Sequence, residues 1–207
     1  MSYLKKKIAI LDYGVGNIFK IKQAVEFNKF SCSVINNLNN LDSFDGLILP
    51  GVGSFPQAMK KLNKINARNK IRNFVKNKKL LGICLGMQLL MDVGEEIKLT
   101  KGLGLIPGKV VRFPKQIKPH VGWNTVSINK KIKYNEKKNK NNFFYFTHQF
   151  IVKPKKDYIF GKSKFNGIEF CSVVRNKNVY GVQFHPENST KHGSKLIGLI
   201  FNDNQTN

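Results

Sequence analysis

Short apolar runs alternate with amphipathic stretches along the first half of the chain. The runs have the length of buried strands and cover residues 8–11, 32–35, 46–49 and 80–83. Between them, apolar residues recur at helical spacing from residue 17 onwards and again over residues 56–77, with a predicted break around 63–66. Strands that alternate with helices in this way are typical of a parallel sheet with right-handed crossovers.

The second half has a different pattern, in which short strand-like runs are joined by turn-rich segments. The runs cover residues 110–113, 122–128, 143–146, 168–174 and 179–184, and a helix is expected at 192–201. We interpret the polar stretch 129–142 as a surface loop. No repeat or domain boundary is found, so residues 1–207 are expected to form one α/β domain. Its central, mostly parallel sheet would be flanked by helices, with a smaller antiparallel β part in the second half.

The net charge of +24 raises the alternative of a basic nucleic-acid-binding protein. Arginine suits phosphate and base contacts better than lysine. The only arginines among the 36 basic residues are Arg68, Arg72, Arg112 and Arg175. The lysines are spread along the chain and mixed with asparagine, so we interpret the charge as a solvated surface and expect no nucleic-acid partner. A basic surface for an anionic substrate or an acidic partner stays open as an alternative.

The apolar segments also bear on the cellular compartment. None reaches the roughly 18 residues that a membrane span needs, and the run 8–11 is too short for a signal peptide. We therefore expect no membrane contact and a location in the cytoplasm, where the cysteines stay reduced. Cys32, Cys84 and Cys171 are odd in number and have no C-x-x-C spacing, so neither a disulfide framework nor a zinc site is expected.

Cys84 is predicted to lie between a buried strand and a helix, in the sequence Gly82-Ile83-Cys84-Leu85-Gly86. Small residues two positions before and after a nucleophile are typical of a nucleophile elbow, where they relieve crowding against nearby backbone. The N-terminal end of the following helix favours a thiolate, and its free N–H groups can bind an oxyanion. The helix is expected to carry Leu85, Gln88, Leu89 and Met91. By itself, the pattern also fits a cysteine that only packs.

His185-Pro186-Glu187 follows the apolar run 179–184 and is therefore expected at the carboxyl end of a strand. Sites of parallel α/β sheets assemble at that edge. In an extended segment, residues two apart point the same way, so Glu187 can accept a hydrogen bond from His185 and fix its tautomer. A base that is held by a carboxylate and faces a nucleophile follows the logic of a catalytic triad.

Pro50-Gly51-Val52-Gly53 ends another predicted parallel strand and should reach the same edge. The N–H group of Val52 could then face the oxyanion of a reaction intermediate, with the N–H of Leu85 as the second donor. The same residues also fit an ordinary strand-to-helix turn.

Three blocks of the chain resemble those of class I (triad) glutamine amidotransferases, in order and at suitable spacing. They are Pro50-Gly-Val-Gly53, Gly82-Ile-Cys-Leu-Gly-Met-Gln88 and Gly181-Val-Gln-Phe-His-Pro-Glu187. Met87 stands where many members of the wider class have histidine. Pro119-His-Val-Gly-Trp-Asn124 and Tyr145-Phe-Thr-His148 are similar to segments of the glutaminase subunits of imidazole glycerol phosphate synthases. The similarity extends from about residue 8 to residue 199.

The resemblance implies a class I amidotransferase fold and a mechanism. Cys84 would attack the side-chain amide of L-glutamine, with His185 as acid and base and Glu187 orienting it. Gly51 and Gln88 would help to bind the substrate. Ammonia would pass to a (β/α)8 cyclase subunit in a heterodimer, which makes imidazole glycerol phosphate and AICAR in histidine biosynthesis. Neither a metal nor an organic cofactor is implied.

The chain departs from the family at two places on the side of the cyclase. Asn188 stands where members usually carry Lys or Arg after His-Pro-Glu, and Gln149-Phe150 stands where Ser or Thr and then Tyr are common. Both leave the triad intact but bear on coupling to the usual cyclase. The alternative is a paralogue that supplies ammonia for nucleotide-sugar modification in surface polysaccharide synthesis. A non-catalytic partner subunit is disfavoured by the intact triad.

The remaining candidates are expected to have structural roles. Cys32 and Cys171 lie in apolar runs and are expected to pack. His120 is expected to be structural or to face the interface, and for His148 the interface and packing are both open. His192 is expected on the solvated surface. The segment Gly14-Val-Gly-Asn17 lacks a full phosphate-binding fingerprint, so we interpret it as a tight turn beside the partner interface.

Overall fold

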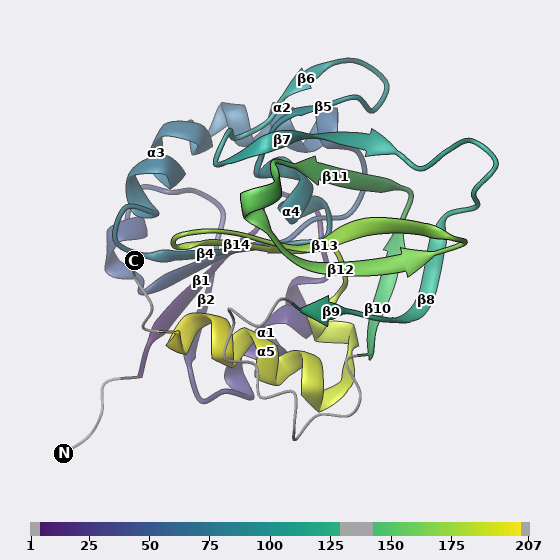
Figure 1. Ribbon diagram of the computed structural model, residues 1–207. Coiled ribbons are helices and arrows are strands. Elements are labelled where there is room, and N and C mark those ends of the chain that lie inside the picture. The colour runs from purple at the N-terminus through teal and green to yellow at the C-terminus, as the bar shows by residue number, and fades with distance from the viewer. Residues whose placement is uncertain (1–4, 129–142, 204–207) are drawn as a thin grey trace.

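The four apolar runs of the first half form neighbouring parallel strands of one sheet (Figure 1). The strand order is β2 (Ser31–Ile35), β1 (Lys7–Leu11), β3 (Gly46–Leu49), β4 (Lys79–Ile83) and β14 (Val179–Val182). Every residue of β3 and β14 is buried, as expected for strands covered on both faces, whereas the edge strand β2 is partly exposed. The computed structural model describes residues 5–128 and 143–203. The predicted surface loop at 129–142 lies outside these residues.

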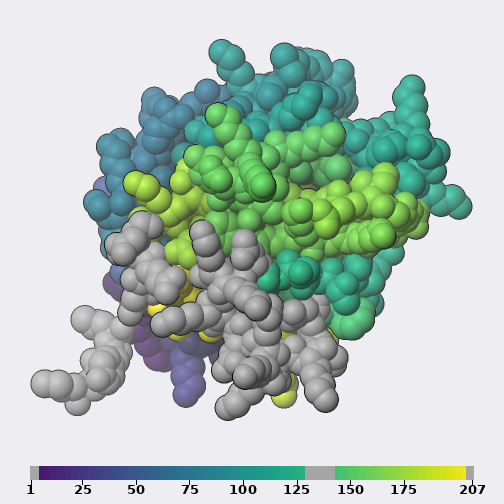
Figure 2. Space-filling view, in the orientation of Figure 1, coloured from purple at the N-terminus to yellow at the C-terminus, as the bar shows by residue number. Residues whose placement is uncertain are grey.

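Beyond the parallel strands, the same sheet continues in mostly antiparallel fashion. Beyond β14 lie β13 (Ile168–Asn176), β11 (Phe150–Pro154), β7 (Ile106–Arg112), β5 (Met91–Gly94) and β6 (Thr100–Lys101). The strand β12 (Ile159–Phe165) pairs with β13 and with β9 (Ser127–Ile128). A separate antiparallel ribbon joins β8 (His120–Thr125) to β10 (Phe143–His148). In the space-filling view, the side chains of the antiparallel half form one continuous face from teal to yellow-green (Figure 2).

Helices cover both faces of the parallel strands (Figure 1). One face carries α1 (Ile18–Glu26) and α5 (Thr190–Asn202), and the other carries α2 (Phe55–Lys64) and α3 (Ala67–Phe74). Asn17 caps α1, because its side-chain oxygen accepts a hydrogen bond from the Lys20 amide at 3.2 Å. The predicted break around residues 63–66 is confirmed, since Asn66 adopts a left-handed conformation between α2 and α3. Three short 3₁₀ helices lie at Leu41–Ser43, Lys156–Tyr158 and Pro186–Asn188.

The expected α/β domain with a parallel sheet and an antiparallel β part is confirmed, but two expectations about its elements were wrong. The run 122–128 is divided between β8 and β9. Met91 begins β5 instead of continuing a helix, because α4 (Leu85–Leu89) ends after five residues. The amides of Leu103 and Leu105 donate hydrogen bonds to the carbonyls of Leu89 and Leu90. These carbonyls therefore have partners although the helix does not continue. Within the described residues, no helix has the length and apolar character to cross a membrane.

Candidate active site

Three sequence blocks meet at the carboxyl edge of the sheet because their strands are direct neighbours. The strand β4 pairs in parallel with β3 on one side and with β14 on the other. Pro50 follows β3, Cys84 follows β4, and His185 comes shortly after β14. The register places Leu49 beside Gly82 and Val182 beside Ile83, so the three connections leave the sheet at one level. The topology therefore brings the predicted blocks to one place.

Cys84 has a backbone conformation that is rare for a residue with a side chain. Its φ is 53° and its ψ is −110°, and such conformations cost about 1–3 kcal/mol. Close packing of the cysteine turn against β3 maintains this strained conformation. A Cβ on Gly86 would lie 1.8 Å from the carbonyl oxygen of Leu49. Only glycine fits there, as expected from the residues flanking the elbow. The cysteine side chain is almost buried, with 6% exposure, at the start of α4.

His185 is fixed by its backbone as well as by its side chain. Its amide donates to the Tyr145 carbonyl of β10 at 2.8 Å, and its carbonyl accepts from the Ser189 hydroxyl at 2.5 Å. Nδ1 of the ring lies 2.8 Å from Oε1 of Glu187, whose side chain is only 2% exposed. The spacing of two residues thus brings the imidazole and the carboxylate together. This contact fixes Nδ1–H as the protonated nitrogen of the neutral ring.

The surroundings of His185 favour its charged form. Burial opposes the charge, but the negative charges of a Cys84 thiolate and of Glu187 together raise the pKa of the imidazole to about 10. Nε2 is buried and has no hydrogen bond of normal geometry to a described residue. Contacts between a nucleophile and its base are often loose before substrate binds. The imidazole therefore interacts with Cys84, and its Nε2 has no other partner within the described residues.

The loop after β3 lies directly against the cysteine turn. A Cβ on Gly51 would meet the Cβ of Leu85 at 2.8 Å and the amide nitrogen of Gly86 at 2.9 Å, so this approach requires glycine. The Val52 side chain is 46% exposed. Across residues 5–128 and 143–203, no carbonyl or side chain accepts a hydrogen bond from the amide of Val52 or of Leu85. An oxyanion bound by these amides would therefore displace no acceptor of the described residues.

Gln88 lies one helical turn beyond Cys84 and is buried. Its amide nitrogen donates to the Phe150 carbonyl at 3.1 Å and to Oε1 of Gln183 at 3.2 Å. These two bonds fix the orientation of the amide, so Oε1 of Gln88 is the atom that it can offer to a ligand.

Three further residues contact the site without having been singled out from the sequence. The Gln183 amide nitrogen lies 3.7 Å from Sγ of Cys84, and the same sulfur lies 3.8 Å from the carbonyl of Thr147. The Tyr13 hydroxyl donates to the Pro50 carbonyl at 2.5 Å. Burial and then the Cys84 charge raise the pKa of Tyr13 above its usual range, so it stays a donor. A glutamine inside the apolar run 179–184 was the available signal for Gln183.

The other candidate residues lie away from Cys84 or have packing contacts. Cys32 is half-buried in β2, where burial and then Glu26 raise its pKa to about 11. Cys171 is buried in β13, and burial raises its pKa to about 12, so both stay thiols. His120 and His148 are buried against each other, and His192 is partly exposed on α5. The described residues include no group of three or more His, Cys, Asp or Glu side chains suited to a metal.

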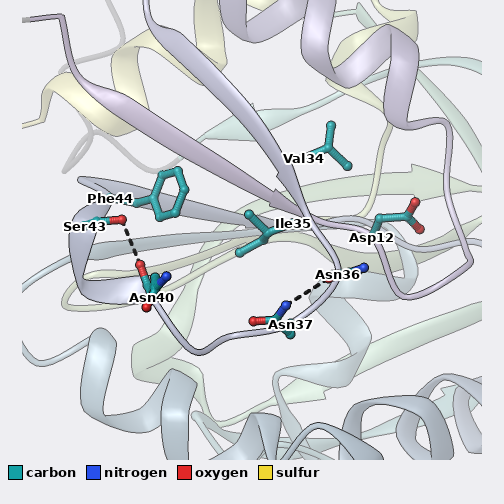
Figure 3. A pocket seen from close by; sticks show the side chains of 8 residues that line it. All are labelled: Asp12, Val34, Ile35, Asn36, Asn37, Asn40, Ser43 and Phe44. Atoms are coloured by element: carbon teal, nitrogen blue, oxygen red, sulfur yellow. Dashed lines mark hydrogen bonds between the residues drawn. The ribbon is translucent and has the colours of Figure 1, made fainter.

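A cavity of about 520 Å³ lies at the same sheet edge but on the far side of β1 (Figure 3). It is lined by polar residues of the connection after β2, together with Asp12 and the apolar side chains beside them. Two of these polar side chains are already used locally, since Asn37 donates to Asn36 and Ser43 donates to the Asn40 carbonyl. None of the triad candidates lines this cavity, so it is separate from the site around Cys84.

Comparisons with known proteins identify the family of the chain. Residues 9–203 match the family Glutamine amidotransferase class-I. The chain is 42% identical over 196 residues to imidazole glycerol phosphate synthase subunit HisH 1 of Methanococcus maripaludis, covering 92% of this chain and 96% of that one. It is 43% identical over 192 residues to imidazole glycerol phosphate synthase subunit HisH of Methanocaldococcus jannaschii, with the same coverage.

Solved structures share the fold at lower sequence identity. The PurLQS structure from Thermotoga maritima superposes with a TM-score of 0.74 at 22% identity, covering 96% of this chain and 99% of that one. The family match spans nearly the whole chain, and the relatives exceed 40% identity over almost their full length. The chain therefore belongs to the class I glutamine amidotransferases.

Proposed function

We propose that this chain is the glutaminase subunit of an imidazole glycerol phosphate synthase. It hydrolyses L-glutamine to glutamate and ammonia and passes the ammonia to a cyclase subunit. The observation that carries the glutaminase assignment is the meeting of a strained cysteine turn with the His185–Glu187 pair at one sheet edge. The choice of synthase is supported by relatives with that printed name at 42% and 43% identity.

In the proposed reaction, the Cys84 thiolate attacks the side-chain carbonyl carbon of glutamine. His185 carries the proton and gives it to the departing ammonia, which leaves a glutamyl thioester. His185 then takes a proton from water, which hydrolyses the thioester and releases glutamate. Glu187 holds the ring in the tautomer and orientation that both steps need. The raised pKa of His185 supports this role, because the proton resides on the imidazole before the attack.

The negative oxygen of the tetrahedral intermediate needs hydrogen-bond donors. We assign this role to the amides of Val52 and Leu85, which have no acceptor among residues 5–128 and 143–203, and this supports the assignment. Removal of one such donor typically costs a factor of about 10² to 10³ in rate. We also assign Gly51 and Gln88 to the substrate site. The close approach of Gly51 to the cysteine turn and the two bonds of the Gln88 amide nitrogen, which leave Oε1 as an acceptor for the amino group of glutamine, support this assignment.

The partner in this proposal is the (β/α)8 cyclase subunit, which uses the ammonia to make imidazole glycerol phosphate and AICAR. The complex is a heterodimer that works in the cytoplasm, and the proposed glutaminase steps need neither a metal nor an organic cofactor. At Asn188, where basic residues are usual, the Lys20 ammonium donates to Oδ1 at 3.0 Å. A positive charge is thus present beside this position, which supports coupling to the usual cyclase over the nucleotide-sugar paralogue.

Co-expression with candidate cyclase subunits tests the proposal. The purified complex should form imidazole glycerol phosphate with glutamine as the nitrogen donor, and the isolated chain should hydrolyse glutamine only slowly. Formation of an aminated nucleotide sugar with a different partner, and no product with any cyclase, would favour the paralogue. Salt-dependent retention on DNA or RNA without glutaminase activity would favour the nucleic-acid alternative.

A further inference from the structure

Two buried histidines face each other in the β8–β10 ribbon. His120 and His148 occupy opposite positions in the strand register, and Nδ1 of His120 lies 3.1 Å from Nε2 of His148. They are only 2% and 7% exposed. Aromatic rings surround them, namely those of Phe113, Phe146, Phe165 and Phe170. In this setting, burial lowers the pKa of His120 to about 4, and burial is also the main cause that lowers that of His148 to about 3. Both rings are therefore neutral at physiological pH.

The hydrogen-bond partners determine the tautomer of each ring. Nδ1 of His148 lies 2.9 Å from the Phe150 carbonyl, which can only accept, so His148 carries its proton on Nδ1. Its Nε2 is then an acceptor, which places the proton of His120 on Nδ1. Nε2 of His120 in turn accepts from the Asn124 amide at 3.2 Å, and that amide also donates to the Lys164 carbonyl at 2.9 Å. Asn124, His120 and His148 thus form a chain of hydrogen bonds. Each donates to the next, and His148 donates to the Phe150 carbonyl.

A second chain of hydrogen bonds joins the Phe150 carbonyl to the nucleophile Cys84. The Gln88 amide nitrogen donates to the Phe150 carbonyl and to Oε1 of Gln183. Because Oε1 of Gln183 is thereby occupied, its amide nitrogen faces Sγ of Cys84 at 3.7 Å. The Gln183 side chain is fully buried, so bulk water does not reach its amide. The orientation of this amide decides whether a donor or an acceptor faces the sulfur.

We infer that the pair His120–His148 positions the nucleophile: it holds the Phe150 carbonyl, which orients Gln88 and thereby directs the amide of Gln183 at the Cys84 thiolate. The histidines are positioning residues and do not contact the substrate. The inference deepens the proposed glutaminase function and rests on it. It differs from simple packing of the two rings, since packing requires a shape but no particular hydrogen-bond donor.

The position of β10 adds a second link between the pair and the nucleophile. Thr147 precedes His148, and its carbonyl lies 3.8 Å from Sγ of Cys84. A thiol can donate to this carbonyl, whereas a thiolate is repelled by it, so the donor from Gln183 is needed most when the sulfur is charged. Loss of the His148 side chain removes its hydrogen bond to the Phe150 carbonyl, one of the two acceptors of the Gln88 amide nitrogen. The expected result is a weaker nucleophile in a protein that still folds.

Three variants of the complete heterodimer separate positioning from packing. His148→Leu fills the space without a donor. His148→Asn places its side-chain nitrogen where Nδ1 was and keeps a donor for the Phe150 carbonyl. Phe170→Leu, the matched control, disturbs the packing around both histidines, whose rings it contacts with centroids 5.2 and 5.7 Å away, but removes no hydrogen bond. The measurements are glutaminase kcat, the alkylation rate of Cys84 by iodoacetamide at neutral pH, and the thermal unfolding midpoint.

We expect His148→Leu to lower both kcat and the alkylation rate about tenfold, the size expected when the Gln183 amide is no longer directed at the charged sulfur, since this is a hydrogen bond to a charged group. His148→Asn should recover most of both rates, and Phe170→Leu should lower the unfolding midpoint while keeping both rates near wild type. Equal rates for His148→Leu and His148→Asn, or equal losses in Phe170→Leu, would overturn the inference. Absence of glutamine hydrolysis by the wild-type complex would instead refute the proposed function, so the two failures are distinguishable.

Discussion

Glu187 provides the sharpest prediction about the reaction, because its contribution can be isolated by the substitution Glu187→Gln. The carboxylate is 2% exposed, and Oε1 lies 2.8 Å from Nδ1 of His185, while Oε2 is buried without a hydrogen-bond partner in the described residues. Glutamine has nearly the same shape but no charge. Its amide can also turn so that a nitrogen donates to Nδ1, which forces the proton of His185 onto Nε2. An imidazole in that tautomer cannot accept the proton of Cys84.

The size of the effect follows from these two losses. A hydrogen bond to a charged group contributes about 1.5–3 kcal/mol, which corresponds to a factor of roughly 10 to 150. A wrong tautomer in the comparable serine protease triad lowers kcat by about 10⁴. We therefore expect glutaminase kcat to fall by about 10² to 10⁴, between the hydrogen bond alone and complete loss of the correct tautomer.

The assay compares glutamine-dependent and ammonia-dependent synthesis by the heterodimer. Glu187→Gln should lose the first and keep the second, and Glu187→Asp, which keeps the charge on a shorter side chain, should retain more activity than the glutamine variant. The pH dependence of the free energy of unfolding provides a second measurement. The pKa of His185 in the folded protein is about 10, above the ordinary value of 6.5. The contribution of His185 to stability is therefore complete below pH 6.5 and is lost as pH rises through about 10. A kcat within threefold of wild type would refute the triad assignment.

Further predictions concern the elbow, the histidine pair and the partner surface. Gly86→Ala should lower both the free energy of unfolding and glutaminase activity, because its Cβ would lie 1.8 Å from a carbonyl oxygen of β3; denaturant titration and kcat measure the two losses. The pKa values of His120 and His148 are lowered to about 4 and about 3, so the protein should lose stability as pH falls from 6.5 towards 3, and His148→Asn should reduce this loss in urea titrations. The Lys20 ammonium lies 3.0 Å from Oδ1 of Asn188, at the proposed partner surface. Lys20→Glu should therefore weaken glutamine-dependent synthesis while ammonia-dependent synthesis persists, and Lys20→Arg should preserve both. Equal activity of the two variants would contradict a role of Lys20 in coupling.

The parallel half of the fold was predictable because its strands are buried on both faces. Continuous apolar runs such as 46–49 and 80–83 are a direct consequence of that burial. The strand β12 was missed because its lysines and Gly161 interrupt the apolar pattern. The end of α4 was missed as well, since the groups that satisfy its last carbonyls come from residues 103–106, beyond any local pattern.

The candidate site shows the same division between local and distant causes. His185 and Glu187 are two residues apart, so their contact follows from strand geometry. The carbonyl of Thr147 reaches the site from β10 and the hydroxyl of Tyr13 from the loop after β1, and a carbonyl contact leaves no trace in the residue type. Gln183 could have been identified from the sequence, because a buried amide within the apolar run 179–184 needs hydrogen-bond partners.

The most direct test of the proposed function is the substitution Cys84→Ala in the reconstituted heterodimer with the cyclase subunit. Imidazole glycerol phosphate formation is measured with glutamine and, separately, with ammonium salt as the nitrogen donor. If Cys84 is the nucleophile of a glutaminase that feeds a cyclase, the variant loses all glutamine-dependent synthesis and keeps the ammonia-dependent rate of wild type. Glutamine turnover that survives the substitution would contradict the central claim.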